Sequence, residues 1–434
     1  MTELYNLSLR ELVAGMREKR WTAARVMDAT IGRIEARERD VQAWEYLDID
    51  RAMRAAERLD TFAGERGPLH GVPLAVKDII DVRGMPTRFG SPIFASAPPA
   101  AASAQCVQAL ERAGAIVLGK SVTTEFAYYT PRKTRNPWNA SHTPGGSSMG
   151  SAAATACGMA AGAIGTQTNG SVIRPAAFCG IVGFKPSFGM VSNHGTLDPW
   201  PSLDHTGVFA RHVADAALLA SVIATPGRIH AAVGLPSHAP KLALVRSPVW
   251  HLAHAAQKDM LEAAAGKLGH AGAHVQEKEL PAEFENAHRV HRVILAYEAG
   301  RHFRELQQHD RDLISARMNE LIDEGAATSE HDYHAALNAA AALRRAYAAY
   351  IQSYEAVITP PTTGEAPATL EETGNPAFCT IWTLLGVPAV TIPVGTGPAG
   401  MPIGVQIVGA RDADDSLLAV AAWCEAHMPF HGLP

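Results

Sequence analysis

Hydrophobic residues near the start of the chain recur at the spacing of amphipathic helices. One series, with members three or four positions apart, comprises Leu9, Leu12, Val13 and Met16. That period predicts a helix with one buried face, and Ser8 and Glu11 have the spacing of a capping box at its first turn. A second helix is expected from Trp21 and Thr22 onward, with an apolar stripe at Val26, Ile31 and Ile34.

Farther along, short apolar runs alternate with helical patterns. We expect strands at 71–76, 115–118, 274–276, 356–359, 389–394 and 403–408, and helices at 104–113, 260–268 and 333–354. This alternation predicts an α/β fold whose sheet is largely parallel and covered by helices on both faces. Residues 282–353 are charged and follow a helical period, so they are interpreted as a helix-rich excursion on the same core.

Composition narrows the class of protein. The chain has 434 residues, a net charge of −5 and five cysteines without a C-x-x-C pair. Without a strong positive field there is no obvious source for the phosphate neutralisation that drives nucleic-acid binding. Scattered cysteines indicate reduced thiols, and the N-terminal segment lacks the apolar core of a signal peptide. These features together predict a cytoplasmic location.

One long stretch carries no formal charge. From Asn136 to Ile173, 38 consecutive residues include no Asp, Glu, Lys or Arg. A membrane span needs about 20 predominantly apolar residues, and this stretch is rich in Gly, Ser, Thr, Asn and Pro instead. It is therefore expected to be buried and specialised, and no membrane association is predicted.

Two glycine turns with serines lie inside this neutral stretch. The first spans 144–148 and the second spans 168–171, and an Ala-rich helix is expected between them at about 151–161. Such turns can direct backbone N–H groups at a developing oxyanion and place a hydroxyl beside them. The alternative is a connecting loop, although surface loops are usually charged. Residues 146–150 also satisfy G-x-S-x-G, but that nucleophile elbow needs a preceding strand, and 139–144 has turn chemistry.

A catalytic serine needs a base. The histidines form only i, i+3 pairs in charged helical stretches, at His251/His254, His288/His291 and His331/His334, with no evident third metal ligand. Lysines at the ends of apolar runs are the other candidates, because desolvation favours the neutral amine. Lys77 and Lys185 both fit. Spacing alone does not choose between them, and either is otherwise expected to be a paired structural ion.

Four segments together resemble the amidase signature family. They are GVPLAVKD (71–78), PGGSSMGSAAA (144–154), TQTNGSVIRPAAFCGIVGFKP (166–186) and LGVPAVTIPVG with GMPIGVQIVG (385–409). Their order and spacing match the family over nearly the whole chain. The resemblance implies one amidase domain over 1–434, with a large mixed sheet of about eleven strands between helical layers and the excursion at about 282–353.

The resemblance also implies a Ser–cis-Ser–Lys triad and assigns its members. Ser171 would be the nucleophile, Ser147 the bridging serine with a cis peptide bond to Gly146, and Lys77 the terminal base. Backbone N–H groups of Thr168, Asn169, Gly170 and Ser171 would form the oxyanion hole. Neither a metal nor another cofactor is expected.

Several positions depart from the family pattern. Gln167 replaces an acid, Asn169 replaces a glycine, and Met149 replaces a Gly or Ser. Arg174 follows the nucleophile by three residues, which resembles the malonamidase-like, biuret- and carbamate-cleaving branch. It is a candidate substrate contact together with Tyr129, and the alternative is that Arg174 pairs with a buried carboxylate.

The expected activity is hydrolysis of a small amide or carbamate (urethane) by water through an acyl-enzyme, in a monomer or homodimer. One alternative is the A subunit of a glutamyl-tRNA amidotransferase, which usually has Ser-Ile-Arg-Gln-Pro where this chain has Ser-Val-Ile-Arg-Pro. Others are an esterase-like serine hydrolase and a non-catalytic binding protein.

Overall fold

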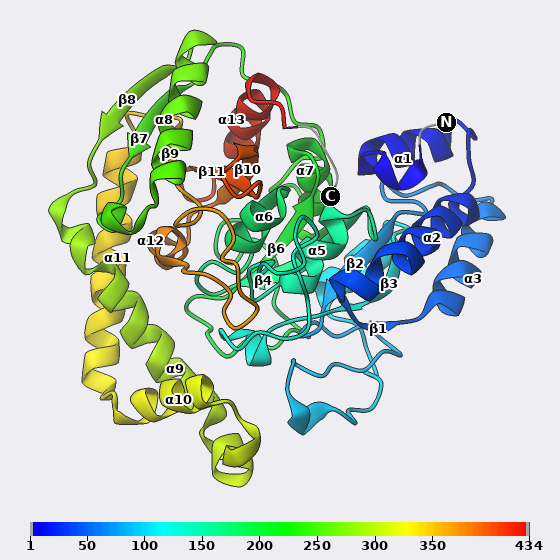
Figure 1. Cartoon of the computed structure of the whole chain (residues 1–434), viewed down its shortest axis with the longest axis horizontal. Helices are drawn as coiled ribbons and strands as arrows, with labels where there is room; N and C mark the ends of the chain where they lie inside the picture. Colours follow the sequence, from blue (N-terminus) through cyan, green and yellow to red (C-terminus); the bar gives the residue numbers. More distant parts are fainter. Residues whose placement is uncertain (1–2, 431–433) are drawn as a thin grey trace.

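A mixed sheet of 11 strands forms the centre of the molecule in the computed structural model, which describes residues 3–430 and 434 (Figure 1). The strand order is β1-β3-β2-β4-β6-β5-β10-β11-β9-β7-β8. In chain order the strands are β1 Trp44–Leu47, β2 Pro73–Lys77, β3 Ile116–Ser121, β4 Gly162–Gln167, β5 Val182–Lys185, β6 His205–Ala210, β7 Lys241–Val245, β8 His274–Lys278, β9 Ala356–Thr359, β10 Ala389–Thr396 and β11 Pro402–Val408. The mixed sheet of about eleven strands that the family resemblance implied is confirmed.

Helices cover both faces of this sheet. They are α1 Leu9–Arg17, α2 Ala23–Val41, α3 Ile49–Asp60, α4 Gln105–Arg112, α5 Met149–Ala156, α6 Ile173–Cys179, α7 Val213–Ile223, α8 Ala255–His270, α9 Ala287–Asp310, α10 Ala316–Ala327, α11 Glu330–Ile351, α12 Ala377–Leu385 and α13 Asp414–His427. Helices α5 and α6 pack against each other, and α6 also contacts β5, β10 and β11. In a second group of helices, α7 packs against α1, α4 and α13.

The prediction of a largely parallel sheet was wrong for its middle. Parallel pairing holds β3, β2 and β4 together near one end and β9, β7 and β8 at the other, while the edge strand β1 pairs antiparallel with β3. Between them, β4, β6, β5, β10, β11 and β9 pair antiparallel. Strands β10 and β11 were expected, but an apolar run does not reveal the direction in which a strand pairs. The short buried strands β4, β5 and β6 were not recognised in the sequence, so their antiparallel pairing was missed as well.

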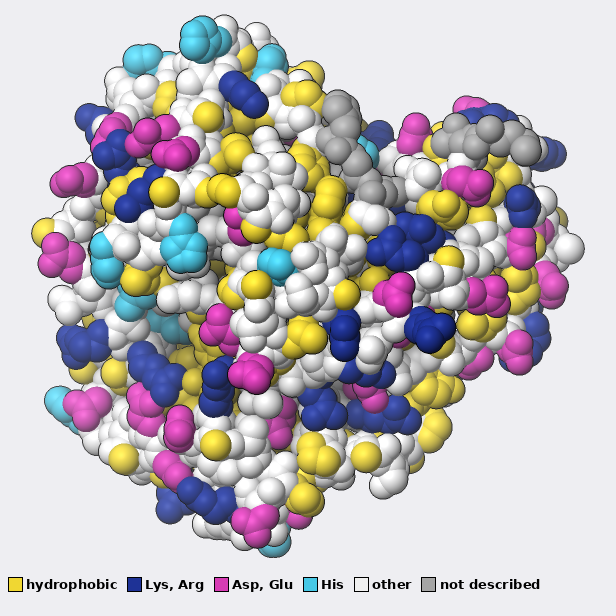
Figure 2. Space-filling model, in the orientation of Figure 1, with side chains coloured by type: hydrophobic (Ala, Val, Ile, Leu, Met, Phe, Trp, Pro, Cys, Tyr) yellow, Lys and Arg dark blue, Asp and Glu magenta, His cyan; other side chains and the backbone are white. Residues whose placement is uncertain are grey.

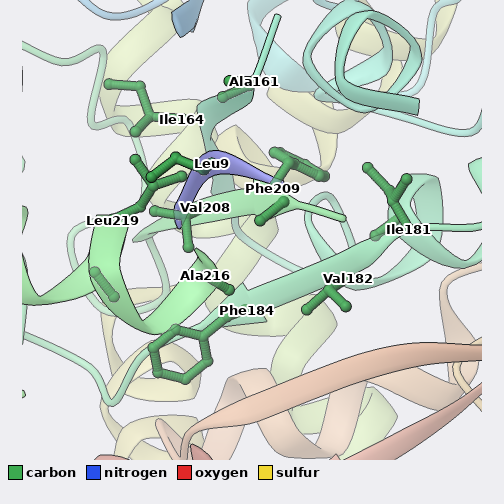
Figure 3. Packing of buried hydrophobic residues seen from close by; sticks show 14 of the residues in the cluster. Leu9, Ala161, Ile164, Ile181, Val182, Phe184, Val208, Phe209, Ala216 and Leu219 are labelled. Carbon is green, nitrogen blue, oxygen red and sulfur yellow. The ribbon is translucent and has the colours of Figure 1, made fainter. Parts of the chain in front are cut away.

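The N-terminal helix forms as its pattern predicted. Ser8 and Glu11 make the capping box, with the Ser8 hydroxyl accepting from the Glu11 N–H at 3.2 Å. The buried carboxyl group of Asp215, on α7, accepts from the Leu9 N–H at 3.1 Å. Figure 3 shows Leu9 beside Val208 of β6 and Leu219 of α7, although some 200 residues separate them in the chain. Helix α1 therefore joins the core of the sheet.

Most of the uncharged stretch is buried, as predicted, although residues 139–141 are exposed. Every residue from 142 to 168 is buried. The Ala-rich helix within it was expected at about 151–161, but α5 spans Met149–Ala156. It ends early because Gly158 adopts the left-handed conformation, with φ +75°, a common helix terminator. The chain then enters β4, which the sequence analysis missed.

Residues 282–353 form helices α9, α10 and α11 with short 3-10 turns. Helix α9 packs against α10, α11 and α12 around a second hydrophobic cluster that includes Phe284 and Ile294. In Figure 1 these helices descend beside the sheet on the left. On the face shown in Figure 2, acidic and basic side chains are interspersed. Among residues 3–430 and 434, we find no helix with the length and apolar character needed to cross a bilayer.

Candidate active site

Lys77 lies at the carboxyl end of β2, between the parallel strands β3 and β4. Its side chain is fully buried. The Nζ atom lies 2.7 Å from Ser147 Oγ and 2.8 Å from Thr166 Oγ1. Burial lowers the pKa of Lys77 to about 7, against an opposing effect of Asp204. A substantial fraction of this amine is therefore neutral near pH 7, as a proton acceptor must be.

Ser147 lies in the first glycine turn, immediately before α5. Its peptide bond to Gly146 is cis. Gly145 precedes it with φ +83°, and a Cβ there would come within 2.7 Å of Pro175 Cα. Glycine at 145 therefore lets the turn approach α6 closely. This packing brings the first serine turn to the start of α6, where the second one ends.

Ser171 lies just before α6 and is 7% exposed. It faces a small cavity of about 20 Å³, to which Ser147 also contributes. The other residues around the cavity are Ala127, Tyr128, Tyr129, Thr168, Asn169, Arg174, Trp200 and Leu295. A larger hollow of about 660 Å³ lies along α1, but no serine or lysine lines it. The small cavity is therefore the candidate active site.

The turn at 168–171 is held firmly against α12. The carbonyl oxygen of Asn169 accepts from Thr383 Oγ1 at 2.5 Å, and its side-chain oxygen accepts from Thr380 Oγ1 at 2.8 Å. A Cβ at Gly170 would lie 3.0 Å from Pro376 Cβ. A turn fixed in this way keeps its backbone N–H groups preorganised for an oxyanion. The clamping threonines lie more than 200 residues away, and no sequence signal identified them.

The side chain of Gln167 forms hydrogen bonds that hold this turn and the start of α6 in place. Its Oε1 accepts from the backbone N–H groups of Val172 at 2.9 Å and Ile173 at 3.0 Å. Its Nε2 donates to Thr383 Oγ1 at 3.0 Å. Gln167 therefore caps the start of α6 without placing a negative charge next to Ser171, and it ties α6 to α12.

Arg174 is buried and lies against the cavity. Its guanidinium donates to the carbonyl oxygens of Gly146 at 2.7 Å and Gly374 at 2.8 Å, and to Thr373 Oγ1 at 3.2 Å. The guanidinium carbon lies 5.7 Å from the ring centre of Tyr129. Its Nε has no partner, and no carboxylate of the described chain lies within ion-pair distance. The alternative of a buried carboxylate partner for Arg174 is wrong.

Lys77 and Lys185, which spacing in the sequence did not distinguish, differ in their hydrogen-bond partners in the structure. Lys185 is as buried as Lys77, and burial likewise lowers its pKa to about 7. Its Nζ donates to the carbonyl oxygens of Val387 at 2.6 Å and Pro186 at 3.1 Å. It makes no ion pair with any described carboxylate, and it does not line the cavity. Only Lys77 contacts a cavity serine.

The other candidates from the sequence lie elsewhere. Ser148, the serine of the G-x-S-x-G match, is fully buried and exchanges hydrogen bonds with the Thr166 backbone at 3.2 and 3.3 Å. His288 and His291 each have Nε2 at 2.9 Å from a backbone carbonyl oxygen, of Ala377 and Thr168 respectively. Within residues 3–430 and 434, no three His, Cys, Asp or Glu side chains gather as a metal site.

Comparison with known proteins places the chain in a family. The family model described as Amidase matches residues 25–418. The chain belongs to the amidase signature family. The A subunit of the glutamyl-tRNA(Gln) amidotransferase from Halothermothrix orenii is 30% identical over 96% of this chain and 96% of its own length. Membership makes the chain an amidase-type hydrolase that acts on carbon–nitrogen bonds.

Solved structures agree with this placement. An amidase crystal structure superposes with a TM-score of 0.89 and 32% identity, covering 97% of this chain and 100% of that one. A peptide amidase in complex with the inhibitor chymostatin gives a TM-score of 0.84 and 29% identity, covering 99% of both chains. The matches extend over the whole architecture, so the helices α9 to α11 belong to the shared fold.

Proposed function

We propose that this amidase hydrolyses the C–N bond of a small amide or carbamate through an acyl-enzyme on Ser171. The observation that carries the proposal is the 2.7 Å contact between Lys77 Nζ and Ser147 Oγ at a cavity that also contains Ser171. In this arrangement a buried amine serves as the base, and the serine between it and the nucleophile relays the proton.

The reaction would proceed in two balanced halves. Ser171 Oγ attacks the carbonyl carbon while its proton passes to Ser147 Oγ, whose own proton passes to neutral Lys77. Backbone N–H groups of Thr168, Asn169, Gly170 and Ser171 would stabilise the oxyanion. The C–N bond then breaks, and the leaving nitrogen takes a proton from Ser147, which Lys77 reprotonates. Water repeats the sequence on the acyl-enzyme and releases the acid.

The cavity limits the acyl group. Its volume of about 20 Å³ is close to the space one water molecule needs. Tyr129 and Arg174 face it, and Arg174 Nε is an unused donor. We therefore favour a short acyl group with an acceptor or negative charge close to Arg174. A carbamate oxygen would also meet this requirement.

The second candidate function is that of an amidotransferase A subunit. Its support is the similarity to the A subunits of glutamyl-tRNA(Gln) amidotransferases. Purified protein run through gel filtration separates the candidates. A monomer or homodimer that releases ammonia from simple amides without added protein supports the hydrolase. Activity only with a co-purifying protein supports the transferase.

A substrate screen tests the main proposal. Ammonia and arylamine release should be followed over amides, anilides, carbamates and esters, with Ser171→Ala as the control. This variant should lose turnover and covalent labelling by a fluorophosphonate, with an unchanged circular dichroism spectrum. A probe adduct mapped to Ser147 or Ser148 instead would contradict the assignment of the nucleophile.

A further inference from the structure

A pair of carboxyl groups lies behind the turn at 168–171. Asp204, immediately before β6, is 7% exposed. Its Oδ1 accepts a short hydrogen bond from the Thr168 hydroxyl, and its Oδ2 accepts from the Trp200 N–H at 3.3 Å. Asp198 is a neighbour of Asp204, because Asn193 Nδ2 donates both to Asp198 Oδ1 and, at 3.4 Å, to the backbone carbonyl oxygen of Asp204.

Two neighbouring carboxyl groups of which one is buried favour holding a proton, because two carboxylates close together repel each other. Asp198 is the more exposed member, and its Oδ1 accepts from Asn193 Nδ2 at 3.3 Å. His302 on α9 adds a favourable interaction for the charged form of Asp198. The proton therefore belongs on Asp204, where burial and the charge of Asp198 raise the carboxyl pKa well above its usual value.

The charge state of Asp204 matters for two reasons. Its hydroxyl partner, Thr168, begins the turn that carries the N–H donors, so a negative charge on Asp204 would lie behind them. An ionised Asp204 would also raise the pKa of Lys77, so less of that amine would be neutral near pH 7. The titratable groups facing the pair are thus Lys77 from β2 and His302 from α9, with Glu298 of α9 also near Asp198.

We propose that Asp204 is a positioning residue that is kept protonated by Asp198 and that fixes the oxyanion turn through Thr168. The inference rests on the proposed function for its catalytic consequence. A neutral carboxyl group orients Thr168 by a hydrogen bond and leaves the base and the N–H donors without an opposing charge. Nothing in the chemistry of the Ser147–Lys77 relay itself requires this second pair.

The test compares Asp204→Asn with Asp204→Ala. Asparagine keeps an acceptor for Thr168 and is neutral, whereas alanine removes the acceptor. With 4-nitrophenyl acetate as the probe, Asp204→Ala should lower kcat about 100-fold, as loss of an oxyanion-hole donor does. Asp204→Asn should stay within threefold of the parent, with the acid limb of its pH profile unmoved. Thr168→Val should lower kcat by a similar factor, and the double variant Thr168→Val/Asp204→Ala should lose little more kcat than Asp204→Ala alone.

A second readout does not depend on catalysis. Infrared difference spectra at neutral pH should show a protonated carboxyl band that Asp204→Asn removes. An ionised Asp204 in these spectra overturns the proposal whatever the activity. A near-normal kcat in Asp204→Ala overturns it as well, provided that Ser171→Ala remains inactive. If Asp204→Ala does not fold, the activities of Asp204→Asn and Thr168→Val test the proposal instead. An acid limb of the kcat profile that lies one pH unit lower in Asp204→Asn would show that Asp204 is charged in the parent, and would contradict the proposal.

Discussion

Two lysines with the same burial show how local contacts determine a residue's chemistry. Lys77 Nζ meets the hydroxyl groups of Ser147 and Thr166, which exchange protons readily. Lys185 Nζ meets only backbone carbonyl oxygens, which accept hydrogen bonds but carry no proton to relay. Desolvation lowers both pKa values to about 7, so a neutral amine alone does not identify the base.

This contrast predicts different effects of Lys77→Met and Lys185→Met. Lys77→Met should fold and lose about 10²–10⁴ in kcat, because general-base help is gone. Lys185→Met should keep most of its kcat per folded molecule. It should unfold more easily by about 1–3 kcal/mol, because a buried carbonyl group loses its donor. Steady-state rates give kcat and urea titrations give the free energy of unfolding for both variants. A Lys185→Met variant that is fully stable but inactive would instead assign the base role to Lys185.

The pH dependence of turnover follows from the same amine. Lys77 accepts a proton only when neutral, so kcat/KM should rise with pH through a midpoint of about 7. Stability should rise too as pH increases from about 7 toward 10.5. In that window the unfolded lysines still bind a proton that the folded ones have lost. A rate profile that is flat from pH 6 to 8 would exclude Lys77 as the titrating base.

At the scale of elements, the sheet edge next to the site is held by a buried ion pair. Asp78 directly follows β2, and its Oδ1 lies 3.0 Å from Lys120 Nζ on β3. Lys120 also donates to Thr87 Oγ1 at 2.7 Å and to the Pro86 carbonyl oxygen at 3.2 Å. These contacts satisfy the ammonium group and join β2, β3 and the loop after β2, so they fix the backbone that carries Lys77.

Lys120→Met should therefore destabilise the fold by about 3–5 kcal/mol, because it leaves the Asp78 carboxyl group buried without its cation. The double variant Lys120→Met/Asp78→Asn should recover part of this loss. Arg25→Met provides the control, since the exposed pair Arg25–Asp28 is expected to contribute about 0–1 kcal/mol. Equal losses from Lys120→Met and Arg25→Met in chemical denaturation would contradict this role for the buried pair.

At the scale of the whole molecule, the candidate active-site cavity is lined by residues from distant parts of the chain. Leu295 comes from α9, Trp200 from the loop before β6, and Tyr128 from the loop after β3. The Tyr128 hydroxyl oxygen accepts a hydrogen bond from Arg292 Nη1 of α9 at 2.8 Å. Helix α9 therefore contributes to one wall of the site.

This wall predicts a preference for short acyl groups. Along a series of acetyl, butyryl and benzoyl anilides, kcat/KM should fall about 10-fold or more per step, as expected for a tight pocket. Leu295→Ala should enlarge the cavity and so reduce the fall in kcat/KM along this series. Ile294→Ala is the matched control, because Ile294 is buried on the same helix but does not line the cavity. Both variants should lose about 2–5 kcal/mol of stability, and an identical change in acyl preference would contradict the assignment of Leu295.

The sequence by itself determined much of this protein. Periodicity located α1 and α2, since amphipathic spacing reflects burial directly, and short apolar runs located β2, β3, β8, β9, β10 and β11. The uncharged stretch predicted a buried segment, and the resemblance to a family supplied the mixed sheet and the candidate residues. What is local in the chain, such as the capping box at Ser8, was legible in the sequence.

Only the tertiary structure decided the rest, because the deciding contacts join residues far apart in the chain. Spacing left Lys77 and Lys185 level and only the family resemblance favoured Lys77, whereas the contact of Lys77 with Ser147, 70 residues away, is visible only in the structure. The hydrogen bonds from Arg174 to Gly374 and from Thr383 to Asn169 each join residues about 200 positions apart. Periodicity records whether a side chain is buried, whereas chemistry depends on which groups burial brings together, and that is set by the pairing of strands and the packing of helices.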